Sequence, residues 1–553
     1  MEKLAISTAE SQVLLRKIRQ RNNEGSVGYF SIGIIGIICL YTFYHWIGYF
    51  YWRFAPMNKI AFQKSTKIIR KIRRLLIVRF PGFISAGHVF IFILYLMVSL
   101  FVLFSNNSFG NLGDFAKRLG WLTVLNINLA IFLALKNTPL LLISNLSHDK
   151  LNFLHQIVGY SCVTFFFLHA IIYTISLSQM GKVSILGEKV QILGITSGLS
   201  LLVILFTAVS LRKHHYEAFY FLHILMAASV LILAILHRPR LLRTKSSFIL
   251  IFTGIVWTLD RFLRLTKYFI YGLKNTAIIT PLPHKGTRVV FSKFPKSAVP
   301  GQHFFIWLPG IRAFETHPFT CLSTNPGEFI ISAHNGFTRS LYERALKEPG
   351  AILRASLDGP YGTVPDLKVF SKVLFIAGGS GASFTCSLAT HLVRKLEYST
   401  KTSIDFTLKM IGWTYSCIDI LASSPNVTLQ IHVTQKECES SLTSSSSNFS
   451  DPEKNLQALN SLDGLCNANV EIKNKTISST SHFYDKISPK IISGRPNLNS
   501  IISQAVNTAS TAERIAIVAC GPSDMMSNVR EITARNIHPK GPSLQLFSEQ
   551  FGW

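Results

Sequence analysis

The sequence predicts a polytopic α-helical membrane domain of about seven helices, followed by a β-rich domain and an α/β domain. Of its 553 residues, 48% are hydrophobic, which excludes disorder over most of the chain. Long apolar runs recur up to about residue 271, and short alternating runs with Pro and Gly punctuation follow from about residue 275. The length allows three or four structural units.

The chain is strongly basic, with 56 Lys and Arg against 28 Asp and Glu and a net charge of +28. Such a charge suits a nucleic-acid binder or a membrane protein whose cytoplasmic loops collect Lys and Arg. The basic clusters lie beside apolar runs, which favours the membrane and leaves nucleic-acid binding with little support. The 8 cysteines are scattered without a C-x-x-C pair, which argues against a zinc site or a disulfide framework.

Seven apolar runs account for the predicted membrane domain, because most approach the about 20 residues that cross a bilayer. Buried helices of a globular domain would rarely recur seven times in succession. The polar residues 1–26 that precede the first run do not have the usual form of a cleavable signal peptide. The runs are Val27–Tyr51, Phe83–Phe104, Gly120–Leu135 (the shortest), Phe153–Leu177, Val190–Leu211, Tyr216–Leu236 and Phe248–Tyr271.

Loop charge predicts the orientation of these runs. Lys and Arg crowd residues 64–79, so the first loop is expected on the cytoplasmic side, with the N-terminus outside and the C-terminal half inside. Arg212 and Lys213 then fall inside, as the rule requires. The basic loop from Arg238 to Lys245 falls outside. Either this loop attracts anionic ligands there, or the helix count is six.

Two histidine pairs share one spacing. His155 and His169 lie 14 residues apart in one apolar run, and His223 and His237 lie 14 apart in another. Fourteen residues return almost to the same helix face, about 21 Å along the axis. Ionisable residues inside a membrane are costly and point to function. The two runs cross in the same direction, so His155 can face His223 and His169 can face His237.

A flat ligand clamped between each pair explains this pattern. Haem iron takes two axial imidazoles in this way, and two stacked haems would form an electron path across the bilayer. A lone membrane histidine more often hydrogen-bonds between helices, but two equal spacings on parallel helices favour haem. Zinc would need a tetrahedral cluster of closer ligands.

The second half of the chain alternates strand and turn signals. An α/β pattern places a glycine turn between a strand and a helix, where backbone N–H groups attract phosphate. A Ser-rich stretch within residues 439–510 predicts a flexible insertion. The expected strands are Arg288–Ser292, His303–Leu308, Phe329–Ala333, Lys372–Ala377 and Arg514–Ala519; the turns are Gly378–Gly381 and Gly521; the helix is Ser383–Leu396.

The segment from His317 to Thr320 follows Pro300-Gly301-Gln302 and a β-rich stretch. Together with the histidine pairs, it makes the chain resemble the ferric reductase / NADPH oxidase family, over roughly residues 85–553 with gaps. The resemblance implies a fungal ferric reductase-like transmembrane oxidoreductase with a di-haem bundle, a ferredoxin-reductase-like β-barrel FAD domain and a nicotinamide-binding domain. The implied division is 1–26 polar N-terminus, 27–271 haem domain (core about 119–237), 272–366 FAD domain and 367–553 NAD(P) domain.

The resemblance also implies roles for individual residues. The terminal aromatic, Trp553, would stack near the flavin ring and yield to nicotinamide, a catalytic role. Asp260-Arg261 and Arg264 resemble a family feature near the membrane–flavin junction, or are basic residues that snorkel at a helix end. The implied FAD-binding residues are His317, Pro318, Phe319, Thr320, Gly336, Thr338 and Arg339; the implied nicotinamide-binding residues are Gly378, Gly379, Gly381, Cys520, Gly521 and Pro522.

Two departures from the family pattern bear on the cofactor. Phe384 stands where the family usually carries Pro. Family members often place an Arg three residues after a strand-end Trp, to contact the NADPH 2′-phosphate. Here Trp413 is followed by Thr414, Tyr415 and Ser416. The resemblance implies NADPH as the donor, and the missing Arg leaves NADH as the alternative.

The family resemblance implies a metalloreductase of iron and copper homeostasis, passing electrons from NAD(P)H through FAD and two haems b to ferric or cupric chelates across the membrane. One alternative is a superoxide-producing NADPH oxidase that uses O2, and another is a non-enzymatic haem membrane protein with a degenerate reductase domain. The expected location is the plasma membrane or the endoplasmic reticulum, with the soluble domain cytoplasmic. No motif indicates a protein partner.

Overall fold

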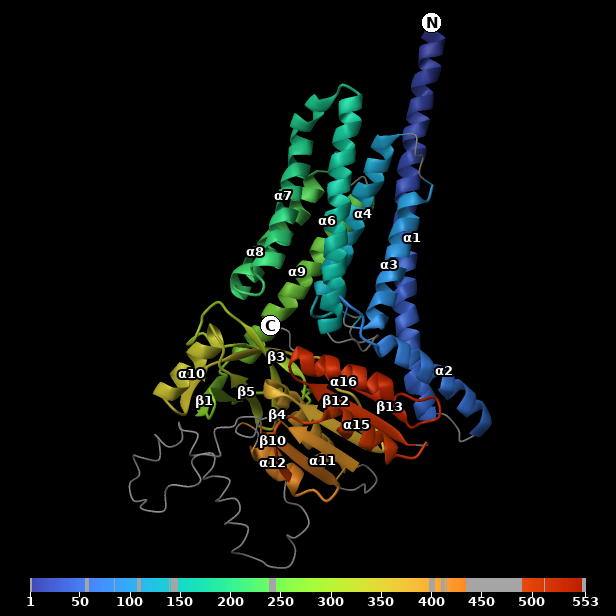
Figure 1. Ribbon diagram of the computed structural model, residues 1–553. Helices are drawn as coiled ribbons and strands as arrows, with labels where there is room; N and C mark the ends of the chain where they lie inside the picture. The colour runs from blue at the N-terminus through green and yellow to red at the C-terminus, as the bar shows by residue number, and fades with distance from the viewer. Residues whose placement is uncertain are drawn as a thin grey trace, which may run out of the picture. The chain divides into compact units, whose positions relative to one another are not determined.

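The computed structural model describes residues 2–54, 59–83, 85–106, 111–138, 140, 148–237, 245–396, 403–408, 413, 415–433, 490–511 and 513–549. The chain divides into two compact units (Figure 1). The helical unit comprises residues 1–56 and 88–265, and the mixed unit comprises residues 57–87 and the described chain from 266 onward. Each unit is described by itself.

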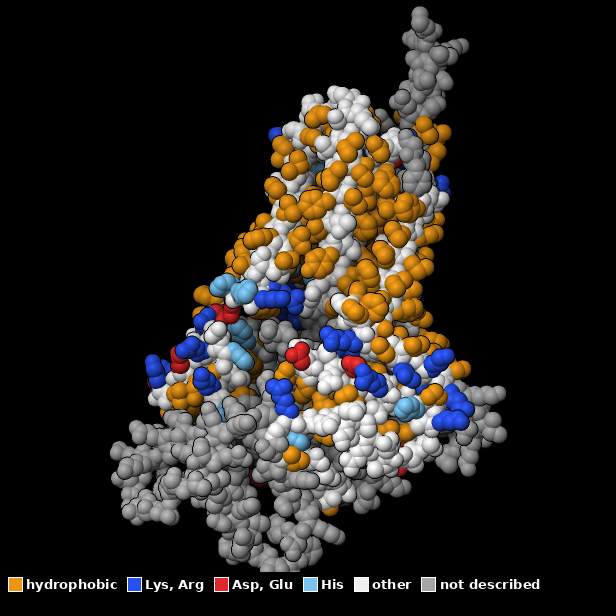
Figure 2. Space-filling view, in the orientation of Figure 1, with side chains coloured by type: hydrophobic (Ala, Val, Ile, Leu, Met, Phe, Trp, Pro, Cys, Tyr) orange, Lys and Arg blue, Asp and Glu red, His pale blue; other side chains and the backbone are white. Residues whose placement is uncertain are grey.

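Every apolar run predicted from the sequence forms a helix. Hydrophobic side chains cover the visible face of these helices (Figure 2), and Phe206 and Phe221 are 66% and 67% exposed. An apolar surface of this extent suits lipid rather than water. The helices are α1 (Glu2–Phe54), α3 (Ala86–Phe104), α4 (Leu112–Ala134), α6 (His148–Gln179), α7 (Lys189–Ser210), α8 (Tyr216–Leu236) and α9 (Lys245–Gly272), with a short 3₁₀ turn, η1 (Val183–Gly187).

Among the described residues, five helices are long and apolar enough to span a membrane. The candidate spans are Val13–Tyr44, Ala86–Phe104, Leu151–Gln179, Lys189–Ser210 and Tyr216–Leu236. Helices α4 and α9 are not among them. Charged residues such as Asp114 and Arg118 in α4, and Asp260 and Arg261 in α9, make these helices less apolar.

The polar residues before Val27 are also helical, because α1 begins at Glu2. A buried polar network ties α1 to the rest of the helical unit. Arg118 on α4 is 1% exposed and donates hydrogen bonds to Asn23 Oδ1 at 2.9 Å and to the Val102 carbonyl at 3.0 Å. Arg19 pairs with Asp114 at 2.9 Å. A buried guanidinium requires such partners, because its desolvation is costly.

The basic segment 64–79, expected as a loop, lies mostly in helix α2 (Lys59–Ile77) of the mixed unit. Apolar residues recur in it at helical spacing, for example Ile68, Ile72 and Leu75. This segment is both rich in basic residues and apolar at helical spacing. The prediction of a loop used the charge alone, whereas the spacing indicates a helix.

The mixed unit contains an antiparallel sheet of seven described strands in the order β6-β1-β2-β5-β4-β3-β7. Its inward residues, such as Phe304 and Phe329, form one apolar core. The three strands predicted here are confirmed, each shifted by at most two residues. The elements are β1 (Thr276–Leu282), β2 (Gly286–Phe291), β3 (His303–Trp307), β4 (His317–Thr324), β5 (Gly327–Ser332), α10 (Phe337–Lys347), β6 (Ala351–Arg354) and β7 (Ser356–Tyr361).

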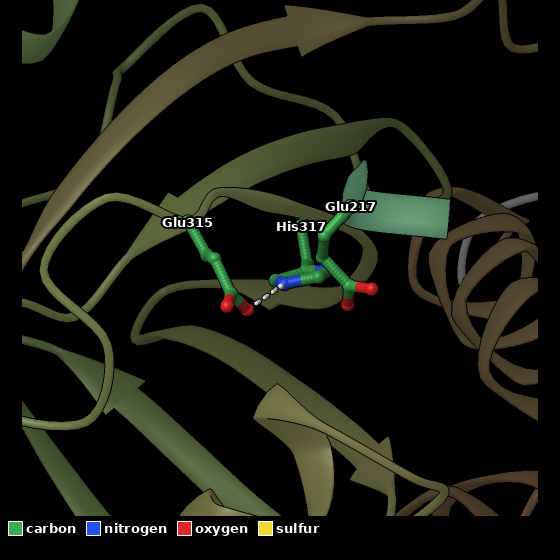
Figure 3. A group of neighbouring side chains, drawn as sticks. All are labelled: Glu217, Glu315 and His317. Atoms are coloured by element: carbon green, nitrogen blue, oxygen red, sulfur yellow. Dashed lines mark hydrogen bonds and ion pairs between the residues drawn. The ribbon is translucent and has the colours of Figure 1, made fainter. Parts of the chain in front are cut away.

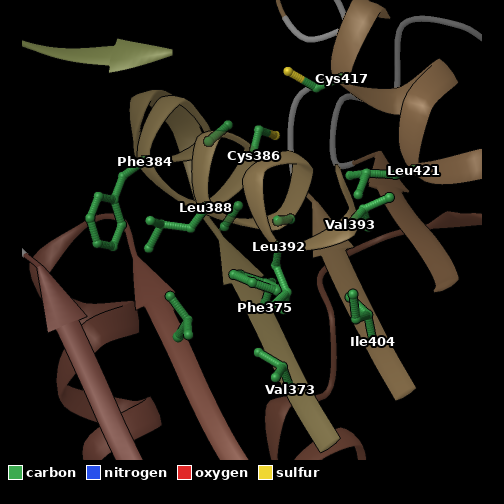
Figure 4. Packing of buried hydrophobic residues seen from close by; sticks show 14 of the residues in the cluster. Val373, Phe375, Phe384, Cys386, Leu388, Leu392, Val393, Ile404, Cys417 and Leu421 are labelled. Carbon is green, nitrogen blue, oxygen red and sulfur yellow. The ribbon is translucent and has the colours of Figure 1, made fainter. Parts of the chain in front are cut away.

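The second sheet is parallel, and its six described strands run in the order β11-β10-β9-β8-β12-β13. Successive side chains of each strand point to opposite faces of the sheet, and both faces are covered by helices. Val373 and Phe375 of β8 pack on helices α11 and α12 (Figure 4), and Leu374 and Ile376 pack on α15 and α16. The elements are β8 (Lys372–Ala377), η3 (Gly379–Gly381), α11 (Ala382–Leu396), β9 (Ser403–Leu408), α12 (Tyr415–Ala422), β10 (Val427–Val433), β11 (Lys490–Ser493), α15 (Leu498–Asn507), β12 (Arg514–Cys520), α16 (Ser523–Asn536) and β13 (Ser543–Glu549), preceded by η2 (Leu367–Val369).

Part of the expected insertion at 439–510 forms regular secondary structure. Residues 434–489 lie outside the described residues, but Lys490–Ser493 forms the edge strand β11, and Leu498–Asn507 forms α15. Helix α15 covers one face of the parallel sheet with Ile502 fully buried. The end of the predicted insertion therefore belongs to the folded domain.

Candidate functional site

The four membrane histidines occupy two helices, as predicted. His155 and His169 lie on α6, His223 lies on α8, and His237 directly follows α8. The rings of His155 and His223 face each other, with 6.0 Å between centroids and an interplanar angle of 62°. The structure therefore brings the first pair together.

Helix α4 orients the two histidines of α6. His155 Nδ1 donates to the Ala130 carbonyl at 2.8 Å, and His169 Nδ1 donates to the Ala116 carbonyl at 2.7 Å. The two alanines are 14 residues apart, like the two histidines, and in the reverse order, as antiparallel helices require. A carbonyl only accepts, so Nδ1 carries the proton and Nε2 keeps its lone pair for a metal.

Glycines provide the space for these contacts. His237 Nδ1 donates to the Val190 carbonyl at 2.6 Å, one turn before Gly194 on α7. A Cβ at Gly194 would lie 2.6 Å from His237 Cε1. Gly120 stands in the same relation to Ala116, and its Cβ would lie 3.2 Å from the ring of His169. In both helices, the missing side chain uncovers the carbonyl that the imidazole needs.

The geometry of the first pair, His155 and His223, fits the requirement for holding one haem iron. Imidazole nitrogens ligate metals at about 2 Å, so two rings that share one iron have centroids roughly 6 Å apart. The 6.0 Å between His155 and His223 matches that requirement. The buried Nδ1 of His223 has no hydrogen-bond partner among the described residues. The donor set consists of neutral imidazoles, the usual axial ligands of haem iron.

Asp260 on α9 has a structural role in the helical unit. Its carboxylate is buried, accepts hydrogen bonds from the backbone N and the side-chain Nδ2 of Asn137, both at 2.9 Å, and pairs with Arg261 at 2.7 Å. Asn137 follows the end of α4, so Asp260 fixes the helix whose carbonyls orient the histidines. Arg264 is 8% exposed, which does not fit a residue that merely snorkels.

The two predicted flavin segments lie against each other. His317 at the start of β4 stacks on Phe337 at the start of α10, with 4.6 Å between centroids, and Phe319 stacks on the same ring at 6.3 Å. Gly336 precedes α10 with φ 75°, a conformation that favours glycine. Thr338 Oγ1 accepts a hydrogen bond from His334 N at 2.8 Å. Free N–H groups at this helix start suit a flavin pyrophosphate.

Glu315 supports the His317 ring from the preceding loop. Its carboxylate lies 3.1 Å from His317 Nε2 (Figure 3) and 2.6 Å from Arg312. Partial burial raises the pKa of Glu315, but hydrogen bonds from Arg312 and His317 outweigh it and hold the pKa below its ordinary value. The imidazole is therefore fixed from one side by a carboxylate and from another by an aromatic ring.

The two loops predicted to bind nicotinamide meet at the point where the order of the parallel sheet reverses. Strands β8 and β12 are adjacent, and Gly378 N donates to the Cys520 carbonyl at 2.9 Å. A Cβ at Gly381 would overlap the Cys520 carbonyl oxygen, and a Cβ at Gly521 would lie 3.1 Å from Gly378 Cα. Ligands bind open α/β sheets at this switch point, beyond the carboxyl ends of the strands.

The sequence departures have structural explanations in part. Phe384 lies in α11, 3% exposed, and packs in the core. The indole of Trp413 donates to the Pro283 carbonyl at 2.6 Å and covers Gly286, so it joins the two sheets of the mixed unit. Thr414 and Trp553 lie outside the described residues.

Three family models match the chain in succession. "Ferric reductase like transmembrane component" matches residues 119–234, "FAD-binding domain" matches 273–365, and "Ferric reductase NAD binding domain" matches 370–534. The chain has the domain order of a ferric reductase. A ferric reductase of this type is a multi-pass membrane oxidoreductase with FAD- and NAD-binding domains.

Three relatives of the chain come from fungi. "Ferric/cupric reductase transmembrane component 2" of Schizosaccharomyces pombe is 26% identical over 79% of this chain and 81% of its own length. "Ferric reductase transmembrane component 4" of Saccharomyces cerevisiae is 26% identical over 76% of this chain and 60% of its own. "Probable cell surface ferric reductase kap2" of Aspergillus oryzae is 27% identical over 51% and 41%. The chain thus spans less than two thirds of the last two.

Among solved structures, the ferredoxin reductase in carbazole 1,9a-dioxygenase is 17% identical over 49% of this chain and 68% of its own, with a TM-score of 0.31. The similarity of the chain to ferric reductases rests on the sequence matches alone.

The sequence prediction missed the groups that orient the histidines. Ala116, Ala130 and Val190 contribute backbone carbonyls, which carry no side-chain signature. The repeat of the 14-residue spacing in Ala116 and Ala130 was available in the sequence. Gly120 and Gly194 sit one turn after two of these carbonyls.

Gly194→Ala should displace the His237 ring, because the added Cβ lies 2.6 Å from Cε1. Loss of a partner that orients a metal ligand typically costs about 10- to 100-fold in metal affinity. We expect the reduced-minus-oxidised haem spectrum to lose one of two haem signals. Gly159→Ala on α6 is the matched control, since no atom lies within 4 Å of its Cβ. Equal haem content in both variants would contradict this role for Gly194.

Gly381→Ala should separate the two nicotinamide loops, because its Cβ overlaps the Cys520 carbonyl. Misplacement by about 1 Å can cost a hundredfold in rate. We expect slower flavin reduction by NAD(P)H in stopped-flow measurements, with FAD retained. Gly541→Ala, whose Cβ has its nearest neighbour at 3.4 Å, should leave the rate unchanged. An unaltered rate in Gly381→Ala would be inconsistent with a nicotinamide site here.

Glu315→Gln tests the support of His317. Because the folded-state pKa of Glu315 is lowered, its charge stabilises the fold above the ordinary pKa of 4.5 and the contribution is lost as pH falls through the folded-state pKa. We expect the variant to unfold at a lower temperature at neutral pH, because its free energy of unfolding falls by no more than about 1 kcal/mol. The difference from wild type should shrink below pH 4.5. Thermal unfolding followed by flavin fluorescence measures this, with Glu531→Gln as control.

Proposed function

We propose that the protein is a transmembrane metalloreductase, which carries electrons from NAD(P)H by way of FAD and two haems b to ferric or cupric ions on the opposite side of the membrane. One observation carries the proposal. Antiparallel helices α4 and α6 pair Ala130 with His155 and Ala116 with His169, at one 14-residue spacing. A structural histidine needs no such duplication.

The residues of the membrane site would hold iron at two levels. His155 and His223 are proposed to ligate one haem, and His169 and His237 the other. Bound haem and flavin supply the electron-transfer chemistry. The protein supplies oriented ligands: each carbonyl-bound Nδ1 fixes the tautomer and the ring direction, and raises the basicity of Nε2. If two imidazoles held each iron, an acceptor would not need to bind the iron itself.

The mixed unit is proposed to receive the hydride donor. His317 to Thr320 and Gly336 to Arg339 would bind FAD, and the loops at Gly378–Gly381 and Cys520–Pro522 would bind the dinucleotide. One hydride carries two electrons, so each NAD(P)H oxidised reduces two one-electron acceptors. The chain's part is to place the nicotinamide about 3–3.5 Å from the flavin. Trp553 is proposed to cover the flavin ring and yield to the nicotinamide.

Ferric or cupric chelates are the proposed acceptors, because the relatives that match the chain are named ferric or ferric/cupric reductases. The cytoplasm is the proposed side of the mixed unit. The plasma membrane is the proposed location, supported by the relative named as a cell surface reductase. NADPH is the proposed donor, with NADH as the alternative because no Arg follows Trp413 at the expected position.

His169→Ala or His237→Ala should abolish reduction of a ferric chelate while flavin content and NAD(P)H-dependent flavin reduction persist, because the change removes only the second histidine pair. Purified protein with NADPH or NADH, with and without chelate, measures this through the haem spectrum and the rate of Fe(II) formation. If both variants still formed Fe(II), the proposal would be contradicted.

The same experiment separates the alternatives. Superoxide formed in air without added metal would favour an oxidase. Iron held by two imidazoles would suit O2 as the acceptor equally well, because the acceptor would not need to bind the iron. Absence of FAD and of NAD(P)H oxidation would favour a haem protein with a degenerate reductase domain, which the missing Arg and Phe384 motivate.

A further inference from the structure

Helix α2 belongs to the mixed unit although it lies, along the chain, between two candidate membrane spans, Val13–Tyr44 and Ala86–Phe104. Four residues separate α1 from α2, and eight separate α2 from α3. The second connection is fixed: Ala86 N donates to the Val78 carbonyl at 2.8 Å. Both ends of α2 are therefore tied by short connections to helices of membrane-spanning character.

One face of α2 is attached to the parallel-sheet domain. Arg70 is 9% exposed and donates to the Pro539 carbonyl at 3.0 Å, and Arg73 donates to the Leu544 carbonyl at 2.9 Å. Ile77 packs against the apolar cluster that contains Leu544. Two charge-assisted hydrogen bonds and an apolar contact thus hold α2 to the edge strand β13 and the loop before it.

The remaining face carries an apolar stripe. Ile68, Ile72 and Leu75 follow each other at spacings of four and three residues and are 62%, 40% and 59% exposed. That spacing places them on one side of a helix. Lys67, Lys71 and Arg74 are exposed beside the stripe, and α2 contains no Asp or Glu. An apolar stripe flanked by basic residues is typical of helices that lie in a membrane interface.

We propose that α2 lies on an anionic lipid surface, with Ile68, Ile72 and Leu75 among the acyl chains and Lys67, Lys71 and Arg74 on the headgroups. On its other face, Arg70 and Arg73 thereby hold the nicotinamide domain to the membrane. Charge complementarity and the two short connections to candidate spans identify lipid rather than a protein as the occupant. Each basic residue near an anionic leaflet favours the bound state about fivefold.

Lipid binding and domain attachment support each other. Burial, and secondarily the charge of Arg73, lower the pKa of Arg514 on β12 to about 10. The two guanidinium groups repel each other when α2 is attached. Anionic headgroups beside α2 offset this repulsion, so the lipid favours the attached state of the domain.

Hydrogen exchange of the full-length protein in nanodiscs tests the proposal. Discs of phosphatidylcholine are compared with discs that also contain phosphatidylserine, at low and high salt. We expect amides of α2 and of residues 539–544 to exchange at least about tenfold more slowly with phosphatidylserine, and the effect to weaken in high salt.

Three variants define the result. Lys67→Glu/Lys71→Glu/Arg74→Glu should abolish the dependence on phosphatidylserine. Arg70→Ala/Arg73→Ala should keep it in α2 and lose it in residues 539–544. Lys347→Glu/Arg394→Glu/Lys395→Glu, exposed basic residues elsewhere in the mixed unit, should behave as wild type. Flavin and haem spectra report folding independently of reductase activity.

Exchange that is the same in both lipids would overturn the proposal, as would a lipid effect that the first variant retains. Loss of metal reduction with the lipid dependence intact would instead count against the proposed function alone.

Discussion

The hydrogen bonds between helix α4 and the histidines of α6 are the constraint on which the helical unit depends. An imidazole can serve an iron only if one nitrogen is unprotonated and aimed, and a neutral ring in a membrane has few partners that fix its tautomer. Ala116 and Ala130 supply that partner from the backbone. The position of α4 along α6 is therefore set, because a slip of one residue would break both bonds at once.

Other features of the helical unit serve to hold α4 in that register. Arg118 and Asp114 attach its first half to α1, and Asp260 holds the residue that follows its end. These charges lower the apolarity of α4 and α9, which explains why two helices of a membrane protein are not among its candidate spans. The polar residues cost desolvation, and their mutual hydrogen bonds offset it.

Much of the fold follows from patterns in the sequence. The apolar runs became helices, and alternation with Gly turns located β8 and β12 within one residue. Loop charge was less informative, because segment 64–79 is both basic and amphipathic, and the structure shows a helix. The histidines were found from spacing, but their orienting carbonyls were not, since any residue type can supply one. The predicted insertion includes residues 490–510 because a low-complexity stretch precedes them, although Ile502 and its neighbours cover the sheet.

The contact of Trp413 with Pro283 and Gly286 has a mechanical consequence. It joins the antiparallel sheet to the parallel sheet at a buried point, where no Cβ separates the indole from the hairpin backbone. Pulling the two sheets apart here would expose a large aromatic surface and break a hydrogen bond. Leu322 and Ile330 of the antiparallel sheet also lie in the apolar cluster of the parallel-sheet domain. Separating the two sheets would therefore expose this cluster together with the indole, so the cost of separation is shared between them.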